Sequence, residues 1–289
     1  MQAYQMPNGK QYKNWREVFK DSQKMVFTAF NTGTIYGALK IYTQVESLPD
    51  DCDPNDAAFE YAVMAFHFRH PEKGDILIDA GFDRSFHDSP PFGNLPVSMK
   101  LFQTLNKIKY TQQENEDLAI HLDEYRIEPR HIFLTHMHAD HSAGVPAVVP
   151  ECSIYFGKKE NSFYYHRLAT GNYLKNRENV YLLDFEDGVS LAPFEKALDI
   201  FGDGSFWALS TPGHTKDHIA YLINCEDAPI LITGDAELST WGMENGVMMG
   251  SDYGEEGEAD ARRSAEMLRE FKEAYPEAQV WFSHDVERL

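Results

Sequence analysis

The sequence has few cysteines and no long apolar run. Its three cysteines among 289 residues, Cys52, Cys152 and Cys225, are widely separated, and none belongs to a Cys-x-x-Cys pair. An odd and sparse set of this kind argues against a disulfide framework and is typical of reduced thiols. No stretch approaches the roughly 20 apolar residues that cross a bilayer, so we expect no membrane association.

Basic residues are scarce as well. Lys and Arg total 26 against 46 Asp and Glu, which gives a formal net charge of −20. A protein that grips a phosphate backbone needs a positive surface, so we expect no nucleic acid partner. The same charge favours a neutral or weakly charged small-molecule substrate.

The chain contains neither a Pro/Gly/Ser-rich linker nor a short-period repeat. We therefore interpret residues 1–289 as a single domain, in which residues 1–24 form an N-terminal extension with a short helix around Trp15 and Phe19. The polar N-terminus has no signal-peptide h-region, which indicates a cytoplasmic protein, although a leader removed earlier would leave the same picture. The sequence leaves a monomer and a homodimer open.

Both halves of the chain supply strands followed by helices, which predicts an α/β protein whose halves face each other across a shared site. Apolar runs predict strands at 25–30, 33–45, 61–68, 74–82, 131–135, 153–156, 180–185, 189–191, 198–201, 206–211, 218–224, 229–233 and 279–282. Apolar periodicity predicts helices over 113–125 and 259–275. We expect 83–112 to run from a loop into a short helix over the site, 157–178 (with His166 on the surface) to be mainly helical, and 235–260 to be a Gly- and Met-rich loop.

The most informative stretch is 131–144, His-Ile-Phe-Leu-Thr-His-Met-His-Ala-Asp-His-Ser-Ala-Gly. A short apolar run predicts a buried strand, which delivers His136, His138, Asp140 and His141 into the following loop. Imidazole and carboxylate favour cations such as zinc. Four ligands in a tetrahedral arrangement would complete the coordination of one structural ion. Alternatively, a tight loop can place two of the ligands on one ion and the other two on a second ion, as in many hydrolases.

Three later segments have the same design, an apolar strand followed by a polar residue. His214 follows Phe206–Thr211 and a Pro-Gly turn, Asp235 follows Pro229–Thr233 and a glycine, and His284 follows Val280–Phe282. A carboxylate has two oxygens, so Asp235 can bridge two cations.

These residues predict a dinuclear site. We assign His136, His138 and His214 to one metal, and Asp140, His141 and His284 to the other, with Asp235 shared. Each ion keeps an open position for a bridging water, which is a catalytic design. Zinc is the expected metal, and iron, manganese or cobalt fit the same ligands.

Two further residues are expected to support the ligands. Asp79 ends an apolar run before Gly81, where a carboxylate can orient a metal-bound histidine, and the alternative is a cap on the next turn. His218, four residues after His214, is expected to act in the same way. The histidines without such a setting are His67, His70, His87, His121 and His131.

The motifs Thr135-His-x-His-x-Asp-His141, Thr211-Pro-Gly-His-Thr-x-x-His218, Gly234-Asp235 and a late His284 resemble those of the metallo-β-lactamase superfamily over about 61–289. The resemblance implies an αββα four-layer sandwich with a di-metal site at one edge of the sheets. Within that superfamily the chain resembles the quorum-quenching N-acyl homoserine lactonases, through Ser-His-Asp285, Leu77-Ile-Asp-Ala-Gly81 and a helical insert after the strand at Ile154.

The sequence departs from those lactonases at one position. They have a tyrosine three residues after the bridging aspartate, where it helps to hold the substrate carbonyl, and here that residue is Leu238. Tyr253, in the loop that follows, is the candidate replacement.

These features predict a metal-dependent hydrolase in which a metal-bridging hydroxide opens a lactone or ester. Asp140 is the candidate catalytic residue, since its free oxygen can pass a proton to the leaving group. The alternatives are a thioesterase of the glyoxalase II type, a phosphodiesterase, a non-catalytic metal-binding protein and a redox di-iron protein, all compatible with the same ligand set.

Overall fold

The computed structural model describes residues 1–160 and 171–286. Within this part of the chain, the first sheet has eight strands, four of them drawn from the first 80 residues. Their order across the sheet is β1 (Gln2–Ala3), β8 (Val180–Leu183), β7 (Ser153–Gly157), β6 (Pro129–Phe133), β4 (Gly74–Ile78), β3 (Glu60–His70), β2 (Val26–Tyr36) and β5 (Lys109–Thr111). The strands from β1 to β4 in this order pair in parallel, and the pairs from β4 to β5 are antiparallel.

The second sheet comes entirely from the second half of the chain. Its six described strands lie in the order β14 (Gln279–Trp281), β13 (Ile230–Ile232), β12 (Ile219–Ile223), β11 (Phe206–Ser210), β10 (Phe194–Asp199) and β9 (Val189–Leu191). Only β13 and β14 pair in parallel. The polar residues that follow β13 and β14 therefore leave the same edge of the sheet.

The two sheets pack face to face because side chains alternate along their strands. In β6, Phe133 points into the core between the sheets, whereas Ile132 points to the outer face of the first sheet. In β12, Tyr221 points into the same central core and Leu222 to the outer face of the second sheet. Each sheet thus has two buried faces, and each outer face needs a covering layer.

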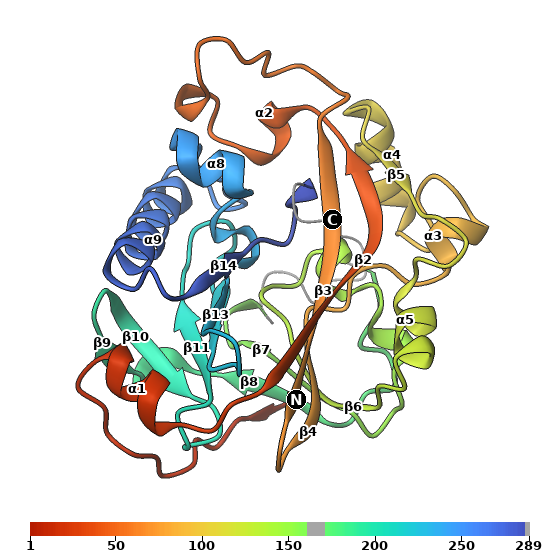
Figure 1. Cartoon of the computed structure of the whole chain (residues 1–289). Coiled ribbons are helices and arrows are strands. Elements are labelled where there is room, and N and C mark those ends of the chain that lie inside the picture. Colours follow the sequence, from red (N-terminus) through yellow and green to blue (C-terminus); the bar gives the residue numbers. More distant parts are fainter. Residues whose placement is uncertain (161–170, 287–289) are drawn as a thin grey trace.

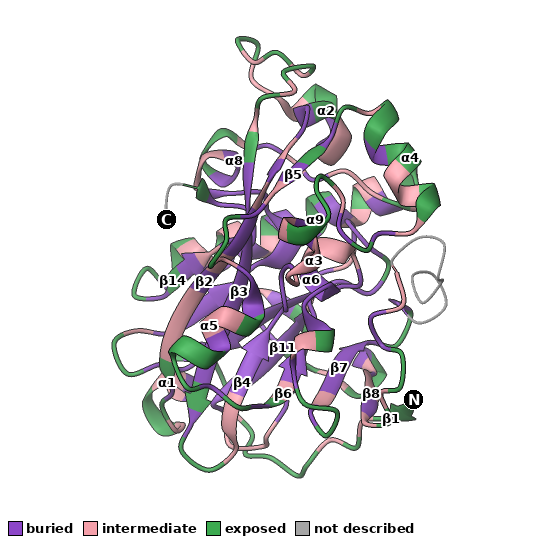
Figure 2. Ribbon diagram, turned by 90° about the vertical axis from the view of Figure 1, so that its right-hand side faces the viewer, coloured by how far each residue is buried: buried purple, intermediate pink, exposed green. Residues whose placement is uncertain are grey.

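Helices supply these covering layers (Figure 1). The second sheet is covered by α1 (Trp15–Asp21), α8 (Thr240–Asn245) and α9 (Glu255–Ala274), and the first by α2 (Leu39–Tyr42), α3 (Ser85–Asp88), α4 (Val97–Leu105), α5 (Leu118–Glu124) and α6 (Ala139–Ser142). Short 3₁₀ turns lie at η1 (Val45–Ser47), η2 (Val145–Ala147), η3 (Phe185–Asp187) and η4 (Gly234–Ala236). Figure 2 shows the central strands β3 and β7 mainly buried and parts of the surfaces of α4 and α5 exposed. The fold is the expected four-layer αββα sandwich.

Some local predictions were wrong. The strand expected over 33–45 ends at Tyr36, and α2 begins at Leu39 because the chain turns where the Gly37 N–H donates to Phe59 O (3.2 Å). The segment 235–260 is not only a loop, because α8 forms there with Ser239 as its N-cap. The 157–178 prediction, including His166, falls largely on residues 161–170, which lie outside the described residues.

The N-terminal extension is integrated into both sheets. β1 adds an edge strand beside β8, and α1 buries Trp15 completely against Phe194 and Trp207 on the second sheet and Phe271 on α9. Among residues 1–160 and 171–286, no helix combines the length and apolarity that crossing a membrane requires.

Candidate metal centre

The predicted ligands meet at one edge of the sandwich, where strands of both sheets end. His136, His138, Asp140 and His141 follow β6, whereas His214, Asp235 and His284 follow β11, β13 and β14. Two hydrogen bonds join the sheets just before the ligands: the Ile219 N–H donates to Thr135 O (2.9 Å), and Tyr221 Oη donates to Leu134 O (3.0 Å). These two hydrogen bonds hold the two halves of the site close together.

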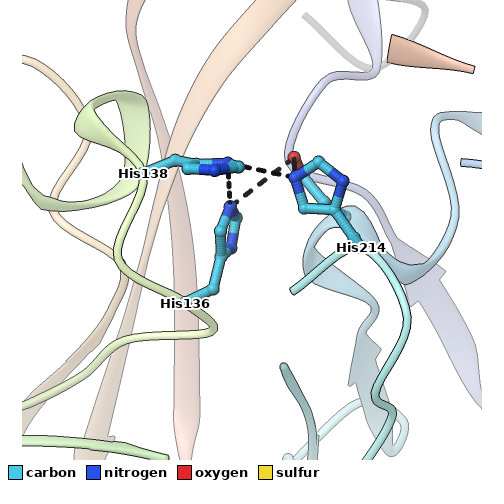
Figure 3. A group of neighbouring side chains, drawn as sticks. His136, His138 and His214 are labelled. Carbon is cyan, nitrogen blue, oxygen red and sulfur yellow. Dashed lines mark hydrogen bonds and ion pairs between the residues drawn. The ribbon is translucent and has the colours of Figure 1, made fainter. Parts of the chain in front are cut away.

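The first group contains three histidines whose ring nitrogens converge (Figure 3). His138 Nδ1 lies 2.9 Å from His136 Nε2 and 3.0 Å from His214 Nε2. Asp235 Oδ2 faces the same point, 3.4 Å from His214 Nε2 and 3.8 Å from His136 Nε2. These four donors match the set expected for one metal.

The second group lies on the other side of Asp235. Asp140 Oδ2 lies 3.6 Å from His141 Nε2 and 3.5 Å from His284 Nε2. Asp235 Oδ1 lies 3.2 Å from each of these two nitrogens. Since one oxygen of Asp235 faces each group, its carboxylate has the geometry of a bridging ligand.

The outer nitrogen of every histidine in the two groups has an acceptor, which fixes the ring and its tautomer. The five contacts are His136 Nδ1 to Thr135 Oγ1 (3.0 Å), His138 Nε2 to Asp252 Oδ2 (2.8 Å), His141 Nδ1 to Asp79 Oδ2 (2.8 Å), His214 Nδ1 to Gly250 O (3.0 Å) and His284 Nδ1 to Ala62 O (2.7 Å). With the ring protons placed outward, the lone pairs of the inner nitrogens point at one another. A cation between them removes this repulsion.

In the absence of a metal the site is electrostatically mixed: although burial lowers the pKa values of His141 and His284, neighbouring carboxylates, led by Asp235, outweigh burial and raise both. Burial lowers the pKa of His136 well below its ordinary value, so its inner nitrogen is a free donor at neutral pH. Although burial raises the pKa of Asp235, His284 and His141 outweigh this effect and hold it well below the ordinary range. His141 Nε2 and Asp235 Oδ1 are buried and lie 3.2 Å apart as an ion pair, but neither has the geometry of a hydrogen bond with the other or with another described residue. Orphaned buried atoms of this kind are costly unless a ligand such as a metal satisfies them.

Asp79 supports the ligand loop, as expected. Its buried carboxylate accepts hydrogen bonds from the Thr135 N–H (2.8 Å), Thr135 Oγ1 (3.0 Å) and His141 Nδ1 (2.8 Å). Burial raises its pKa above the ordinary value. The loop packs directly on the turn that follows Asp79, because the Gly144 N–H donates to Gly81 O (2.8 Å) and a Cβ at Gly144 would lie 2.0 Å from Ala80 O.

His218 also lies beside the site. Burial lowers its pKa to about 3, so the ring is neutral, and its Nε2 accepts a hydrogen bond from the Asp235 N–H (3.0 Å). Gly234 allows this close approach: its φ is +55°, and a Cβ there would lie 2.6 Å from His218 Nε2. The ring therefore positions the backbone of Asp235.

The five histidines expected to be ordinary have other contacts. His67 pairs with Asp75, His70 with Asp203 and His131 with Tyr155, while His87 and His121 contact the backbone oxygens of Gln112 and Asn31.

A cavity of about 280 Å³ opens onto both groups. Its lining residues are Ile35, Ile41, Tyr42, Met99, Phe102, Gln103, Ile108, Tyr110, His138, Ala139, Asp140, His214, Asp235 and Asp252. One wall is thus apolar and aromatic, supplied by β2, α2, α4 and β5, as expected of the segment 83–112. The opposite wall carries the histidines and carboxylates.

Tyr253 does not face this cavity. Its hydroxyl donates to Asp260 Oδ2 (2.8 Å), and the cavity wall among the described residues includes Tyr42 and Tyr110 but not Tyr253. The expectation that Tyr253 replaces the tyrosine missing at Leu238 is therefore not supported. Sequence reasoning also missed Asp252 and Tyr42, because neither stands at a strand end or in a motif.

Curated relatives match parts of the chain. It is 30% identical over 119 residues to the lactamase-like protein aptB of Emericella nidulans, covering 41% of this chain and 31% of that protein. It is 29% identical over 141 residues to a hydroxyacylglutathione hydrolase of Buchnera aphidicola, covering 47% of this chain and 45% of that protein. The chain thus spans less than half the length of either relative.

Solved structures match almost the whole chain. A quorum-quenching N-acyl homoserine lactone hydrolase superposes with a TM-score of 0.67 at 19% identity, covering 92% of this chain and 94% of that one. A second structure of such a hydrolase, with the product N-hexanoyl-L-homoserine bound at its catalytic metal centre, gives 0.66 at 20% identity over 92% and 95%. AidC, a dizinc quorum-quenching lactonase, gives 0.58 at 18% identity over 92% and 89%. At these identities the likeness establishes the fold.

The family model of the metallo-beta-lactamase superfamily matches residues 61–275, which contain every candidate ligand except His284. Together with the αββα sandwich and the histidine-rich edge, this match shows that the chain belongs to the metallo-β-lactamase superfamily.

Proposed function

We propose that the protein is a dinuclear metallohydrolase that opens a lactone or ester, similar to the N-acyl homoserine lactonases. The observation that carries this proposal is the placement of seven donors in two groups around Asp235, at the base of an apolar cavity. His136, His138, His214 and Asp235 would hold one cation, and Asp140, His141, His284 and Asp235 the other. Two divalent cations, zinc by preference, supply a hydroxide at neutral pH and polarise the substrate carbonyl when bound.

The chain's own residues provide the rest of the chemistry. Asp140 lines the cavity, and its side chain is 18% exposed, more than Asp235 at 5%. A carboxylate with one oxygen toward the histidines and the other toward the cavity can take up a proton and return it to the leaving alkoxide. We therefore assign the proton transfer to Asp140.

The apolar wall indicates the substrate class. Ile35, Met99, Phe102 and Ile108 can bury an acyl chain or another apolar group close to the reacting carbonyl. No Lys or Arg is among the described residues that line the cavity. Outside the two metal groups, the described lining residues include one carboxylate, Asp252, which would repel a substrate with several negative charges, so a neutral lactone or ester fits best.

A glutathione thioesterase is the second candidate, because the sequence match to hydroxyacylglutathione hydrolases covers part of the chain. A glutathione thioester carries two carboxylates. The described residues that line the cavity include no basic side chain that could bind them. A phosphodiester carries one negative charge, for which the described lining likewise offers no basic side chain.

The deciding experiment measures metal content and turnover together. Purified protein is assayed with a long-chain N-acyl homoserine lactone, a glutathione thioester and bis-p-nitrophenyl phosphate. We expect turnover of the lactone above the other two, and about two metal ions per chain. His136→Ala is expected to lose metal and turnover together, while His87→Ala, a histidine outside the two groups, retains both. Undiminished lactone hydrolysis by metal-free His136→Ala would refute the proposal, and a dominant thioesterase activity would favour the second candidate.

A further inference from the structure

A short loop segment, residues 250–252, contacts two of the three histidines in the first group. Gly250 O accepts a hydrogen bond from His214 Nδ1 (3.0 Å), and the Asp252 N–H donates to His214 O (3.1 Å). The Asp252 carboxylate accepts a hydrogen bond from His138 Nε2 (2.8 Å). This segment, called here the 250–252 clamp, therefore holds one histidine by its ring and backbone and the other by its ring.

The clamp is attached on its other side to the cavity wall. The Gly250 N–H donates to Tyr42 O (2.7 Å), and the Gln44 N–H donates to Met248 O (2.9 Å). Gln44 Nε2 also donates to Met249 O (2.9 Å). Because Tyr42 lines the cavity, the clamp connects the substrate-facing wall with the histidines of the first group.

Asp252 differs from the acceptors of the other four histidines. Thr135 and Asp79 are fully buried beside β6 and β4, and Ala62 and Gly250 act through backbone oxygens. Asp252 is a loop side chain that is 38% exposed. Its removal therefore leaves no buried partner unsatisfied in the core.

His138 is also the histidine that packing holds least. Its side chain is 27% exposed, whereas those of His136, His141, His214 and His284 are 9% exposed or less. A ring with solvent on one side rotates unless a hydrogen bond fixes it, and rotation would turn Nδ1 away from His136 and His214. The 2.8 Å contact with Asp252 holds Nε2 on the opposite side of the ring and so keeps Nδ1 aimed at the group.

We propose that Asp252 is a positioning residue that orients His138 and so sets the affinity of the first group for its cation. The inference rests on the metal site of the proposed function. Carboxylate partners of metal-binding histidines typically contribute 10- to 100-fold in metal affinity or activity. We expect an effect of that size on one of the two sites, because Asp252 contacts no residue of the Asp140, His141 and His284 group in the described structure.

The test is a zinc titration against a chromophoric chelator that resolves two binding steps. Asp252→Ala is expected to weaken one step about 10- to 100-fold and to leave the other within a factor of two. Asp252→Asn, whose amide oxygen still accepts the His138 hydrogen bond, is expected to recover part of the loss. Glu255→Gln, which removes the same charge three residues along on an exposed side chain, is the matched control and should equal the wild type.

The outcomes separate the inference from the proposed function. If the wild-type protein binds no zinc, the proposed function itself is contradicted. Two unchanged steps in Asp252→Ala, or equal weakening of both, would overturn only the role of Asp252. Circular dichroism and the melting temperature of the metal-free variants show whether the fold is kept, and Asp252→Asn gives the answer if the alanine variant does not fold.

Discussion

Glu160 offers a test of how burial tunes a carboxyl group in this fold. The side chain is fully buried after β7, where its Oε1 accepts a hydrogen bond from the Asp217 N–H (3.1 Å) and its Oε2 has no hydrogen-bond partner among the described residues. Burial raises the pKa of Glu160 from its ordinary 4.5 to about 7. The folded state therefore prefers the protonated carboxyl group.

The raised pKa has a definite effect on stability. Below pH 4.5 the carboxyl group is protonated in both the folded and the unfolded state, so it does not change the free energy of unfolding. As the pH rises from 4.5 to 7 the buried group lowers the free energy of unfolding progressively, and above pH 7 this loss of stability is constant. The difference between a pKa of 4.5 and one of about 7, at roughly 1.36 kcal/mol for each pH unit, corresponds to a loss of roughly 3 kcal/mol in the free energy of unfolding at pH 8.

Glu160→Gln removes this cost and keeps an oxygen for the Asp217 N–H. Urea unfolding at pH 5 and pH 8, with excess chelator so that metal binding does not contribute, gives the stability difference between variant and wild type. We expect the free energy of unfolding of the variant, relative to that of the wild type, to be about 2–3 kcal/mol higher at pH 8 than at pH 5. Glu186→Gln, on an exposed side chain, is the control and should show no such gain. A difference for Glu160→Gln that is the same at both pH values would refute the reasoning.

Two further predictions concern the ligand loop and the metal. Gly144→Ala places a Cβ 2.0 Å from Ala80 O, so we expect the free energy of unfolding, measured in urea, to fall by roughly 1–3 kcal/mol. Gly188→Ala is the control, because the nearest atom to its Cβ is 3.1 Å away, and its free energy of unfolding should fall less. Equal decreases in the two variants would contradict the clash at Gly144. Metal removal by chelation should lower stability by about 3 kcal/mol per site at a metal concentration 100 times the Kd, seen as a lower melting temperature by calorimetry, and an unchanged temperature would count against a bound cation.

The structure brings the candidate ligands together as the sequence predicts, because each follows an apolar strand. Because β11, β13 and β14 run in the same direction, their carboxyl ends lie at one edge of the second sheet, and His214, Asp235 and His284 follow those ends. Asp79 was found for the same reason, since it ends the run of β4.

Asp252 and Tyr42 could not be found in this way. Asp252 lies in a loop without apolar periodicity, and its partner His138 is 114 residues away in the sequence. Tyr42 lies on α2, where Leu39 and Ile41 alternate as they would in a strand, so the pattern pointed to the wrong element. Tyr253 was singled out by its place in the sequence, but the orientation of its hydroxyl toward Asp260 is decided by packing.

The placement of the candidate ligands on both sheets has a consequence for how this protein can change. Four follow β6 of the first sheet and three follow strands of the second, so a small slide of one sheet over the other alters the spacing within both groups of donors at once. The slide is controlled by side chains such as Phe133 and Tyr221 in the core between the sheets. Substitutions at these core positions, which lie outside the cavity lining, could therefore change the turnover rate during evolution without any change in the candidate ligands.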